Sequence, residues 1–294
     1  MNSVGSMKKI RQFIEYLFAL LFYLLISLFP VSVGSKMSGY LCMFVFMSLS
    51  LKRKKRVKEQ LRKYLNLSDK ESHQHAKLIY YHFGQNIAEL AMIKTMLKKN
   101  YFLCPKLPSQ DKKGNIYVAA HFSNWEVAGI PSIKSGQKTA CVYRHISNPF
   151  IDKFVLKRRS LIYNGGCYEK FNVTAMDLVK LINNNINVAL VCDEKRFNGI
   201  NIDFLGHKAY SNTVPALLAR RTSADIYAIK ADRERNSNYS FVIDKIDVRK
   251  SKDKNNTILN ITTKINNIYS NWILSNPSEW WLWNHEKWKQ KNEE

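Results

Sequence analysis

The first long apolar stretch of the chain covers residues 14–29 and reads IEYLFALLFYLLISLF. Three basic residues between positions 8 and 11 precede it, as in a signal peptide, but no small-x-small cleavage site follows and Pro30 ends it. Its 16 residues fall just short of the roughly 17 to 25 that a spanning helix needs. We therefore expect a short transmembrane anchor in preference to an interfacial helix.

A second apolar stretch, residues 39–51, is too short to span and is expected to lie on the membrane or pack on the domain. The basic run KRKKRVKEQLRK follows at 52–63. Alone it would indicate a solvated helix face or a nucleic-acid patch. Beside two apolar stretches it indicates the cytoplasmic side of a membrane, where anionic lipid contributes about 1 kcal/mol per basic residue. We expect an anchoring segment over 1–51 and the main domain over 52–294.

Beyond residue 64, helical periodicity alternates with short apolar runs. Residues 75–97 carry apolar side chains at three- and four-residue steps, which predicts a long amphipathic helix. Strand-like runs cover 115–120, 139–144, 160–164, 187–194 and 224–233, and further helical stretches cover 173–185 and 213–222. This alternation predicts an α/β fold, a single domain with a mixed, largely parallel sheet flanked by helices.

Charged residues stand where several of these runs end. His121 follows the first run, Arg144 ends the second, Asp193 lies at the end of the fourth and Arg233 closes the fifth. In open α/β sheets, ligands bind outside the carboxyl ends of the strands, so these side chains could converge on one face. Strand ends also reach solvent, where polar residues are ordinary. Arg144 has a guanidinium suited to bidentate bonds with a phosphate or carboxylate.

The segment AAHFSNWEVAG, residues 119–129, places His121 and Glu126 five residues apart. On a continuous helix that spacing turns about 140°, which would point the two side chains away from each other. Ser123 and Glu126 form an S-x-x-E helix-start signature, so we expect His121 at a strand end, Ser123 starting a helix and Glu126 in its first turn. The two side chains could then meet, with Glu126 orienting His121 as a general base. Alternatively, Glu126 only caps the helix.

Composition narrows the chemistry only a little. The net charge of +23, from 46 Lys and Arg against 23 Asp and Glu, suits nucleic acid, an anionic membrane or phosphorylated substrates. The five cysteines are scattered without a C-x-x-C pair, so neither a disulfide framework nor a metal site is indicated. No G-x-S-x-G elbow is present, and no cysteine has an activating partner in sequence, so direct transfer is expected rather than a covalent enzyme intermediate.

Four motifs in register resemble those of the bacterial lipid A biosynthesis late acyltransferases, within the wider lysophospholipid acyltransferase group. They are HFSNWE, an H-x-x-x-x-E motif at 121–126, VYR at 142–144, CDEKRFNGINIDFLGHKA at 192–209 and PSEWWLWNHEKWK at 277–289. In that family the corresponding pieces read approximately GHFGNWE, VYR, a DQ pair followed by F-F-G, and W-x-W-x-H-x-R-W-k. The resemblance runs from the N-terminal anchor to about residue 289.

The resemblance implies transfer of a fatty acyl chain from acyl carrier protein, or less often coenzyme A, to a hydroxyl of a Kdo-bearing lipid A precursor. It implies a bacterial inner-membrane location with the catalytic domain on the cytoplasmic face, and no cofactor, metal or nucleic-acid partner. By likeness, His121 would be the base and Glu126 its orienting carboxylate. The resemblance extends substrate contacts to the motif residues Ser123, Asn124, Tyr143, Arg144 and Asp193.

This chain departs from the family pattern at several positions. Ala120 and Ser123 stand where glycine is usual, and Glu194, Leu205 and Lys287 replace Gln, Phe and Arg. Two other functions stay open: acyl transfer to another glycolipid or an aminolipid, and a non-catalytic basic module tethered to the membrane. The second explains the charge but leaves the His121 motif without a role. Tryptophans 280, 281, 283 and 288 are expected to be core residues or interfacial anchors.

Overall fold

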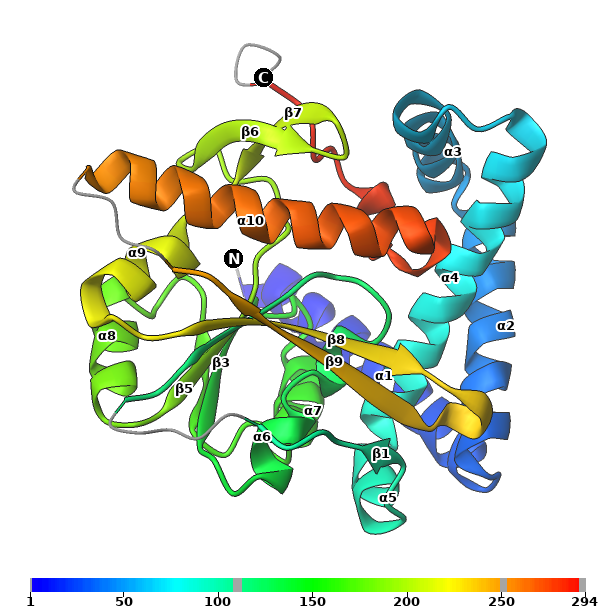
Figure 1. The fold of residues 1–294 in the computed structure, drawn as a ribbon. Helices are drawn as coiled ribbons and strands as arrows, with labels where there is room; N and C mark the ends of the chain where they lie inside the picture. Colours follow the sequence, from blue (N-terminus) through cyan, green and yellow to red (C-terminus); the bar gives the residue numbers. More distant parts are fainter. Residues whose placement is uncertain (1, 108–112, 249–252, 291–294) are drawn as a thin grey trace.

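The computed structural model describes residues 2–107, 113–248 and 253–290. A seven-stranded sheet with the order β1-β9-β8-β2-β5-β3-β4 forms its centre, as Figure 1 shows. Neighbouring strands are parallel except β8 and β9. The strands are β1 (Phe102–Leu103), β2 (Ile116–Ala119), β3 (Thr139–Tyr143), β4 (Gly166–Glu169), β5 (Asn187–Val191), β8 (Ile226–Arg233) and β9 (Tyr239–Ile246). The predicted α/β fold with a mixed, largely parallel sheet is confirmed.

Helices cover both faces of this sheet (Figure 1). They are α1 (Asn2–Ser27), α2 (Val31–Leu49), α3 (Leu51–Leu65), α4 (Asp69–Ala91), α5 (Ile93–Lys98), α6 (Ile130–Lys134), α7 (Pro149–Arg159), α8 (Ala175–Asn183), α9 (Val214–Thr222) and α10 (Lys254–Ser275). Successive residues of β2 point to opposite faces, so Ile116 and Val118 join the core under α8, α9 and α10, and Tyr117 and Ala119 join the core that includes α5 and α6. Both cores therefore meet at β2.

A short hairpin packs on α10, and its turn contains Leu205, one of the departures from the family pattern. Strands β6 (Ile200–Phe204) and β7 (His207–Ser211) pair antiparallel around the turn residues Leu205 and Gly206. Both turn residues have positive φ, 52° and 76°, as a two-residue hairpin turn of this hand requires. Leu205 therefore adopts a backbone conformation that costs an ordinary residue about 1 kcal/mol.

The strand expected at 160–164 is wrong. These residues form the turn after α7, and β4 begins only at Gly166. Ile162 and Tyr163 are buried in the core beside α6, so their apolar character reflects packing after a helix. A short apolar run cannot distinguish the two situations. The predicted runs at 115–120, 139–144, 187–194 and 224–233 contain strands β2, β3, β5 and β8, and the helical stretches 173–185 and 213–222 contain α8 and α9.

The predicted helix at 75–97 is divided and begins earlier than expected. It starts at Asp69 behind a capping box in which Ser68 and Glu71 satisfy each other's backbone N–H groups. It ends at Ala91, and α5 continues after Met92. Strand β9 and helix α10 follow further along and were not predicted.

Helix α2 packs closely on α4. A Cβ on Gly39 would lie 2.7 Å from the Tyr81 ring, and one on Gly84 would lie 2.4 Å from the backbone oxygen of Ser38, so the glycines permit this approach. The Ser38 hydroxyl donates to the Gly84 carbonyl at 2.7 Å. Of the two placements expected for residues 39–51, the part within α2 therefore packs on the domain.

Helices α1 and α3 complete the N-terminal part. Residues 7–27 form the one helix in the described part of the chain that is long and apolar enough to cross a membrane. The basic run 52–63 lies within α3, which buries Val57 and Leu61 in the core and exposes Lys52, Arg53 and Lys55. The charged residues of this run thus form a solvated helix face.

Candidate active site

Strand pairing brings His121 and Asp193 together, although 72 residues separate them. Strands β2 and β5 are parallel and Ala119 pairs with Val191, so residues two positions further along each strand lie side by side. The Cys192 amide donates to the Ala119 carbonyl at 3.1 Å, which extends the register past the strand ends. His121 was predicted at a strand end, and it stands two residues after β2.

Asp193 holds His121 through two hydrogen bonds. Its Oδ1 lies 2.7 Å from His121 Nδ1, and its Oδ2 accepts the His121 backbone N–H at 2.8 Å. Trp280 Nε1 donates to the same Oδ2 at 2.8 Å. The carboxylate accepts here, so Nδ1 carries the hydrogen and Nε2 is left as the proton acceptor. The His121 side chain is 18% exposed and that of Asp193 is 0% exposed, so a substrate can reach only the imidazole.

The charges of this pair reinforce each other. Burial alone lowers the pKa of His121, but the negative charge and hydrogen bond of Asp193 outweigh it and raise the pKa. Burial alone raises the pKa of Asp193, but His121, Trp280 and the backbone donor outweigh it and lower the pKa. The imidazolium that forms when His121 takes a proton is therefore stabilised in place.

Glu126 bonds an arginine and not His121. Its two carboxylate oxygens accept from Arg159 Nε at 2.8 Å and from Nη2 at 2.6 Å, a bidentate ion pair across the wall of the site. Both side chains are mostly buried, with 12% of Glu126 and 16% of Arg159 exposed. The contact expected between His121 and Glu126 is thus corrected, because Asp193 is the carboxylate bonded to the imidazole.

The loop between His121 and Glu126 differs from the predicted helix start. Ser123 is buried with φ 50°, in the left-handed region, which fits the glycine usual in the family at this position. Asn124 is the cap, since its Oδ1 accepts the Glu126 N–H at 3.2 Å. The helix that follows is the short 3-10 segment η1 (Trp125–Val127), so Glu126 does lie in its first turn.

A buried polar network supports this loop from behind. Asn124 Nδ2 donates to Glu89 at 3.0 Å and to the Tyr239 hydroxyl at 3.1 Å. Glu89 is 0% exposed and pairs with Arg233 Nη2 at 3.0 Å. Asn86 donates to the Ser123 carbonyl at 2.6 Å. Arg233, which the sequence placed among converging strand-end residues, therefore lies behind the loop as a partner of Glu89.

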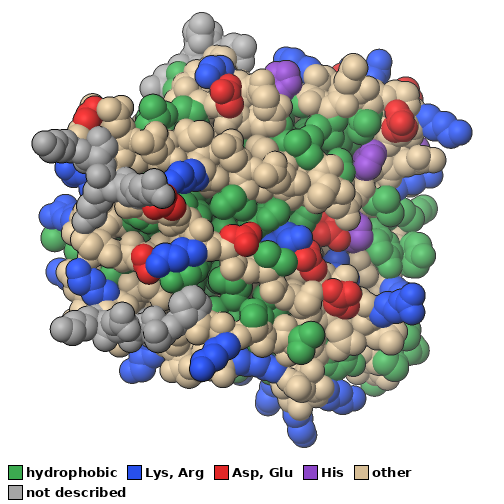
Figure 2. Space-filling view, in the orientation of Figure 1, with side chains coloured by type: hydrophobic (Ala, Val, Ile, Leu, Met, Phe, Trp, Pro, Cys, Tyr) green, Lys and Arg blue, Asp and Glu red, His purple; other side chains and the backbone are tan. Residues whose placement is uncertain are grey.

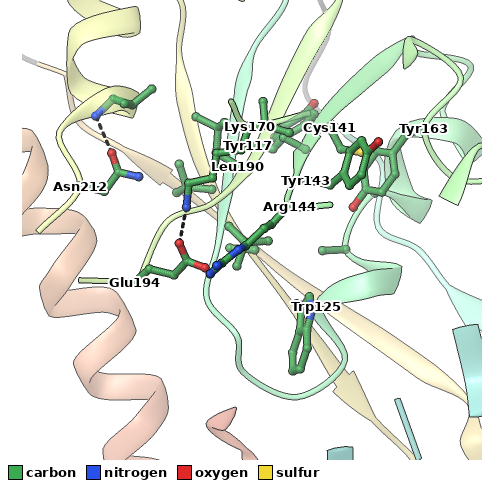
Figure 3. A pocket seen from close by; sticks show the side chains of 18 of the residues that line it. Tyr117, Trp125, Cys141, Tyr143, Arg144, Tyr163, Lys170, Leu190, Glu194 and Asn212 are labelled. Carbon is green, nitrogen blue, oxygen red and sulfur yellow. Dashed lines mark hydrogen bonds and ion pairs between the residues drawn. The ribbon is translucent and has the colours of Figure 1, made fainter. Parts of the chain in front are cut away.

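A cavity of about 320 Å³ opens beside His121. Apolar residues from several strands and helices line much of it, including Tyr117, Val118, Ala189, Leu190 and Leu178. Figure 3 shows Tyr143, Arg144 and Glu194 around this space, with Lys170 bonded to Glu194. His121, Glu126, Tyr143 and Arg144 all line the cavity, whereas Ser123, Asn124 and Asp193 stand behind His121.

Positive charge stands at the edge of this cavity. Arg144 is exposed and Arg196 is half-buried, and across residues 2–107, 113–248 and 253–290 neither has a carboxylate oxygen within 4.0 Å. Arg159 and Lys170 are neutralised by Glu126 and Glu194. An anionic group of a substrate can therefore pair with Arg144 and Arg196.

The C-terminal tryptophan motif closes the back of the site. Trp280 and Trp283 are 0% exposed and Trp288 is 5% exposed, so these three are core residues as expected, and Trp280 also holds Asp193. Lys287, which replaces the usual arginine, is buried, and its Nζ donates to the carbonyls of Glu194 at 3.3 Å and Tyr210 at 3.4 Å. Burial lowers the pKa of Lys287 to about 8.

The geometry defines a class of protein. A carboxylate-held histidine lies at the carboxyl ends of parallel strands and faces an apolar cavity with basic residues at its edge, an arrangement suited to general-base chemistry. The family model described as bacterial lipid A biosynthesis acyltransferase matches residues 4–290, and the chain belongs to this family of acyltransferases. A comparison with curated proteins gave no match. No group of three or more His, Cys, Asp or Glu side chains in the described part of the chain could hold a metal ion.

The sequence analysis did not pair Asp193 with His121 and did not single out Arg159. Asp193 stood in a matching motif, but nothing local in the sequence ties it to His121. Arg159 ends α7 and has no motif of its own. Strand register could have indicated Asp193, because residues that follow aligned parallel strands lie side by side. Nothing in the sequence indicates Arg159 as the partner of Glu126.

The Glu126→Gln variant separates pairing with Arg159 from orientation of His121. We expect the free energy of unfolding to fall by about 1–3 kcal/mol, because Arg159 loses a mostly buried charged partner. The pH at which acyl transfer reaches half its maximum on the acid side is expected to move only a little, to lower pH, because Glu126 contributes less than Asp193 to the raised pKa of His121 and Asp193 still holds the imidazole. Thermal unfolding and a pH profile of the purified enzyme measure both. An unchanged melting temperature, with an acid side shifted as far as in Asp193→Asn, would give the orienting role to Glu126.

Proposed function

We propose that the protein transfers a fatty acyl chain from acyl carrier protein, or from coenzyme A, to a hydroxyl of a Kdo-bearing lipid A precursor at the bacterial inner membrane. The observation that carries the proposal is the His121 imidazole, held by buried Asp193 at the wall of an apolar cavity. The family match gives the class of reaction. An acidic carrier protein and a phosphorylated glycolipid both suit a chain with a net charge of +23.

The proposed reaction is a direct transfer. His121 Nε2 removes the proton from the acceptor hydroxyl while the oxygen attacks the thioester carbonyl of the donor. The tetrahedral intermediate collapses to the new ester, the carbon–sulfur bond breaks, and the imidazolium returns its proton to the departing thiolate. Asp193 keeps the Nδ1–H tautomer and stabilises the imidazolium through both steps.

Other residues are assigned to substrate binding in this proposal. The apolar wall of the cavity, which includes Val118 and Leu190, would receive the acyl chain. Arg144, with Tyr143 beside it, would hold a phosphate or carboxylate of the acceptor, because the Arg144 guanidinium has no carboxylate neighbour among the described residues. Glu126 would act through Arg159, because their ion pair would hold the cavity wall between the apolar residues that receive the acyl chain and the residues that hold the acceptor.

The test is a lipid mass measurement with the full chain in membranes. Acyl carrier proteins loaded with a series of chain lengths are supplied with a Kdo-lipid A precursor, and acyl-CoA serves as the second donor. The expected result is a precursor mass increased by one acyl group with at least one donor. Addition only to a different glycolipid or an ornithine lipid, supplied in parallel, would replace the proposed acceptor. No addition to any acceptor would overturn the function.

A further inference from the structure

An apolar surface covers the outer sides of α1 and α2. Figure 2 shows hydrophobic side chains gathered along the right-hand edge, where α2 lies in Figure 1. On α2 and the residues around it, Val33, Met37, Tyr40, Leu41, Phe44 and Leu49 are exposed. On α1 and the turn that follows it, Ile10, Phe13, Leu17, Phe18, Leu21, Leu24, Leu25 and Leu28 are exposed. We call this set of side chains on α1 and α2 the apolar surface. Exposed patches of this extent mark a membrane or a protein partner.

Helix α1 is docked along α7 and does not stand apart from the domain. Near the start of α7, Gln12 Nε2 donates to the Ser147 carbonyl at 2.9 Å, and Asn148 Nδ2 donates to the Gln12 carbonyl at 2.8 Å. Further along, the rings of Tyr23 and Phe154 lie 5.5 Å apart. These contacts extend from residue 12 to residue 23 of α1, a rise of about 17 Å.

This docking is incompatible with a crossing α1. If α1 crossed the roughly 30 Å hydrocarbon layer, at least half of α7 would be carried into it. Lys153 and Lys157 are exposed on α7, and each would cost about 2.5–3.5 kcal/mol near the bilayer centre. The loop carbonyl at Ser147 and the amide of Asn148 would enter as well.

Helix α2 is tied to the domain in the same way. Its inner side packs on α4 through Gly39 and Gly84, and the Ser35 hydroxyl donates to the buried Glu89 at 2.8 Å. Helix α4 begins with DKESHQHAK, a polar sequence. Neither α1 nor α2 can therefore cross alone.

The basic residues at the two ends of the α1–α2 segment indicate that both ends lie on the same side of the membrane. Lys8, Lys9 and Arg11 are exposed before the apolar part of α1, and the basic residues of α3 follow α2. Basic flanks stay on the cytoplasmic side, so a single crossing between them would put one of the two on the wrong side. Both flanks fit the anionic surface of one leaflet.

We propose that α1 and α2 lie in the plane of the membrane, with the apolar surface in one leaflet and both ends of α1 on the same side as the catalytic domain. The docking of α1 on α7, the packing of α2 on α4 and the two basic flanks carry this proposal. The occupant of the apolar surface is lipid. The arrangement also brings the loop of Arg144 to the lipid surface, because Ser147 and Asn148 bond α1.

Side-specific labelling tests the proposal without an activity measurement. Met7→Cys reports the start of α1, Leu28→Cys the turn after it, and Ser135→Cys, in an exposed position on the catalytic domain, is the reference. Sealed spheroplasts and inverted vesicles that contain the full chain are treated with a membrane-impermeant maleimide, and the parent gives the background from its own cysteines. Met7→Cys and Ser135→Cys are expected to gain a label from the same side. Labels on these two from opposite sides, or a label on Leu28→Cys from the side opposite Ser135→Cys, would overturn it.

Vesicle flotation identifies the occupant of the apolar surface. The detergent-purified chain is mixed with vesicles of phosphatidylethanolamine and phosphatidylglycerol, and the detergent is removed. Phe18→Glu, on a residue 70% exposed, is expected to weaken binding about tenfold, because one large apolar contact is lost. Leu103→Glu, on a residue 78% exposed in β1, is the matched control and should bind as the parent does. A parent that stays with the soluble fraction as a dimer would show that a second copy covers the surface.

Discussion

Replacing His121 with alanine is expected to lower the rate of acyl transfer by about 10²–10⁴-fold. A positioned general base contributes a factor of this size, and no other imidazole lines the cavity in the described part of the chain. The fold should survive, because Asp193 keeps the His121 backbone N–H and Trp280 as donors. The measurement is the initial rate of ester formation, followed by lipid mass in detergent micelles.

His73→Ala is the control for this experiment, because His73 lies on α4 and does not line the cavity. It should transfer acyl groups at the parental rate. A His121→Ala enzyme within a few-fold of the parent, with equal melting behaviour, would remove His121 from the proton transfer and leave the cavity as a binding site only.

The Asp193→Asn variant is expected to lose a similar factor, about 10²–10⁴, together with a change in pH dependence. Asparagine offers one acceptor oxygen to three donors and can favour the tautomer in which Nε2 carries the hydrogen. Asp193 raises the pKa of His121, so its neutralisation lowers that pKa. Transfer needs neutral His121 and increases with pH through its pKa. The acid side of the profile of kcat/KM should therefore move to lower pH.

Glu194→Gln is the matched control for Asp193→Asn. It neutralises the adjacent carboxylate and restores the residue usual in the family, so activity should stay close to the parent. A loss in Asp193→Asn that leaves the acid side in place would mean that Asp193 supports only the fold. A loss of equal size in both variants would mean that the charge of the whole segment matters more than the contact with His121.

The motif around His121 shows what local sequence can and cannot predict. The apolar run 115–120 correctly predicted a buried strand and therefore the place of His121 at its end. The S-x-x-E signature predicted the helical turn but named the wrong cap, because Asn124 and not Ser123 accepts the Glu126 N–H. Several polar residues in a short loop can occupy the capping position. The hydrogen bond to the buried Glu89 holds Asn124 there.

Elements were missed for related reasons. The run 160–164 was predicted as a strand because it is short and apolar, but it forms the turn after α7, in which only Ile162 and Tyr163 are buried. The capping box at Ser68 shows that a start signal was available for α4, whereas α10 begins with polar residues that carry little periodicity. A short apolar run predicts that a segment packs inside the molecule but does not predict the secondary structure in which it packs.

By itself, the sequence determined the α/β architecture, the position of His121 after a strand, the apolar N-terminal helix and, through four motifs in register, the resemblance to the acyltransferase family. These depend on patterns within a few residues or on motifs that keep their order. Only the tertiary structure decided the partners: Asp193 for His121, Arg159 for Glu126, and α7 for α1. Each of these pairs is separated by 33 residues or more, and the parallel register and helix packing that join them are set by contacts across the whole domain.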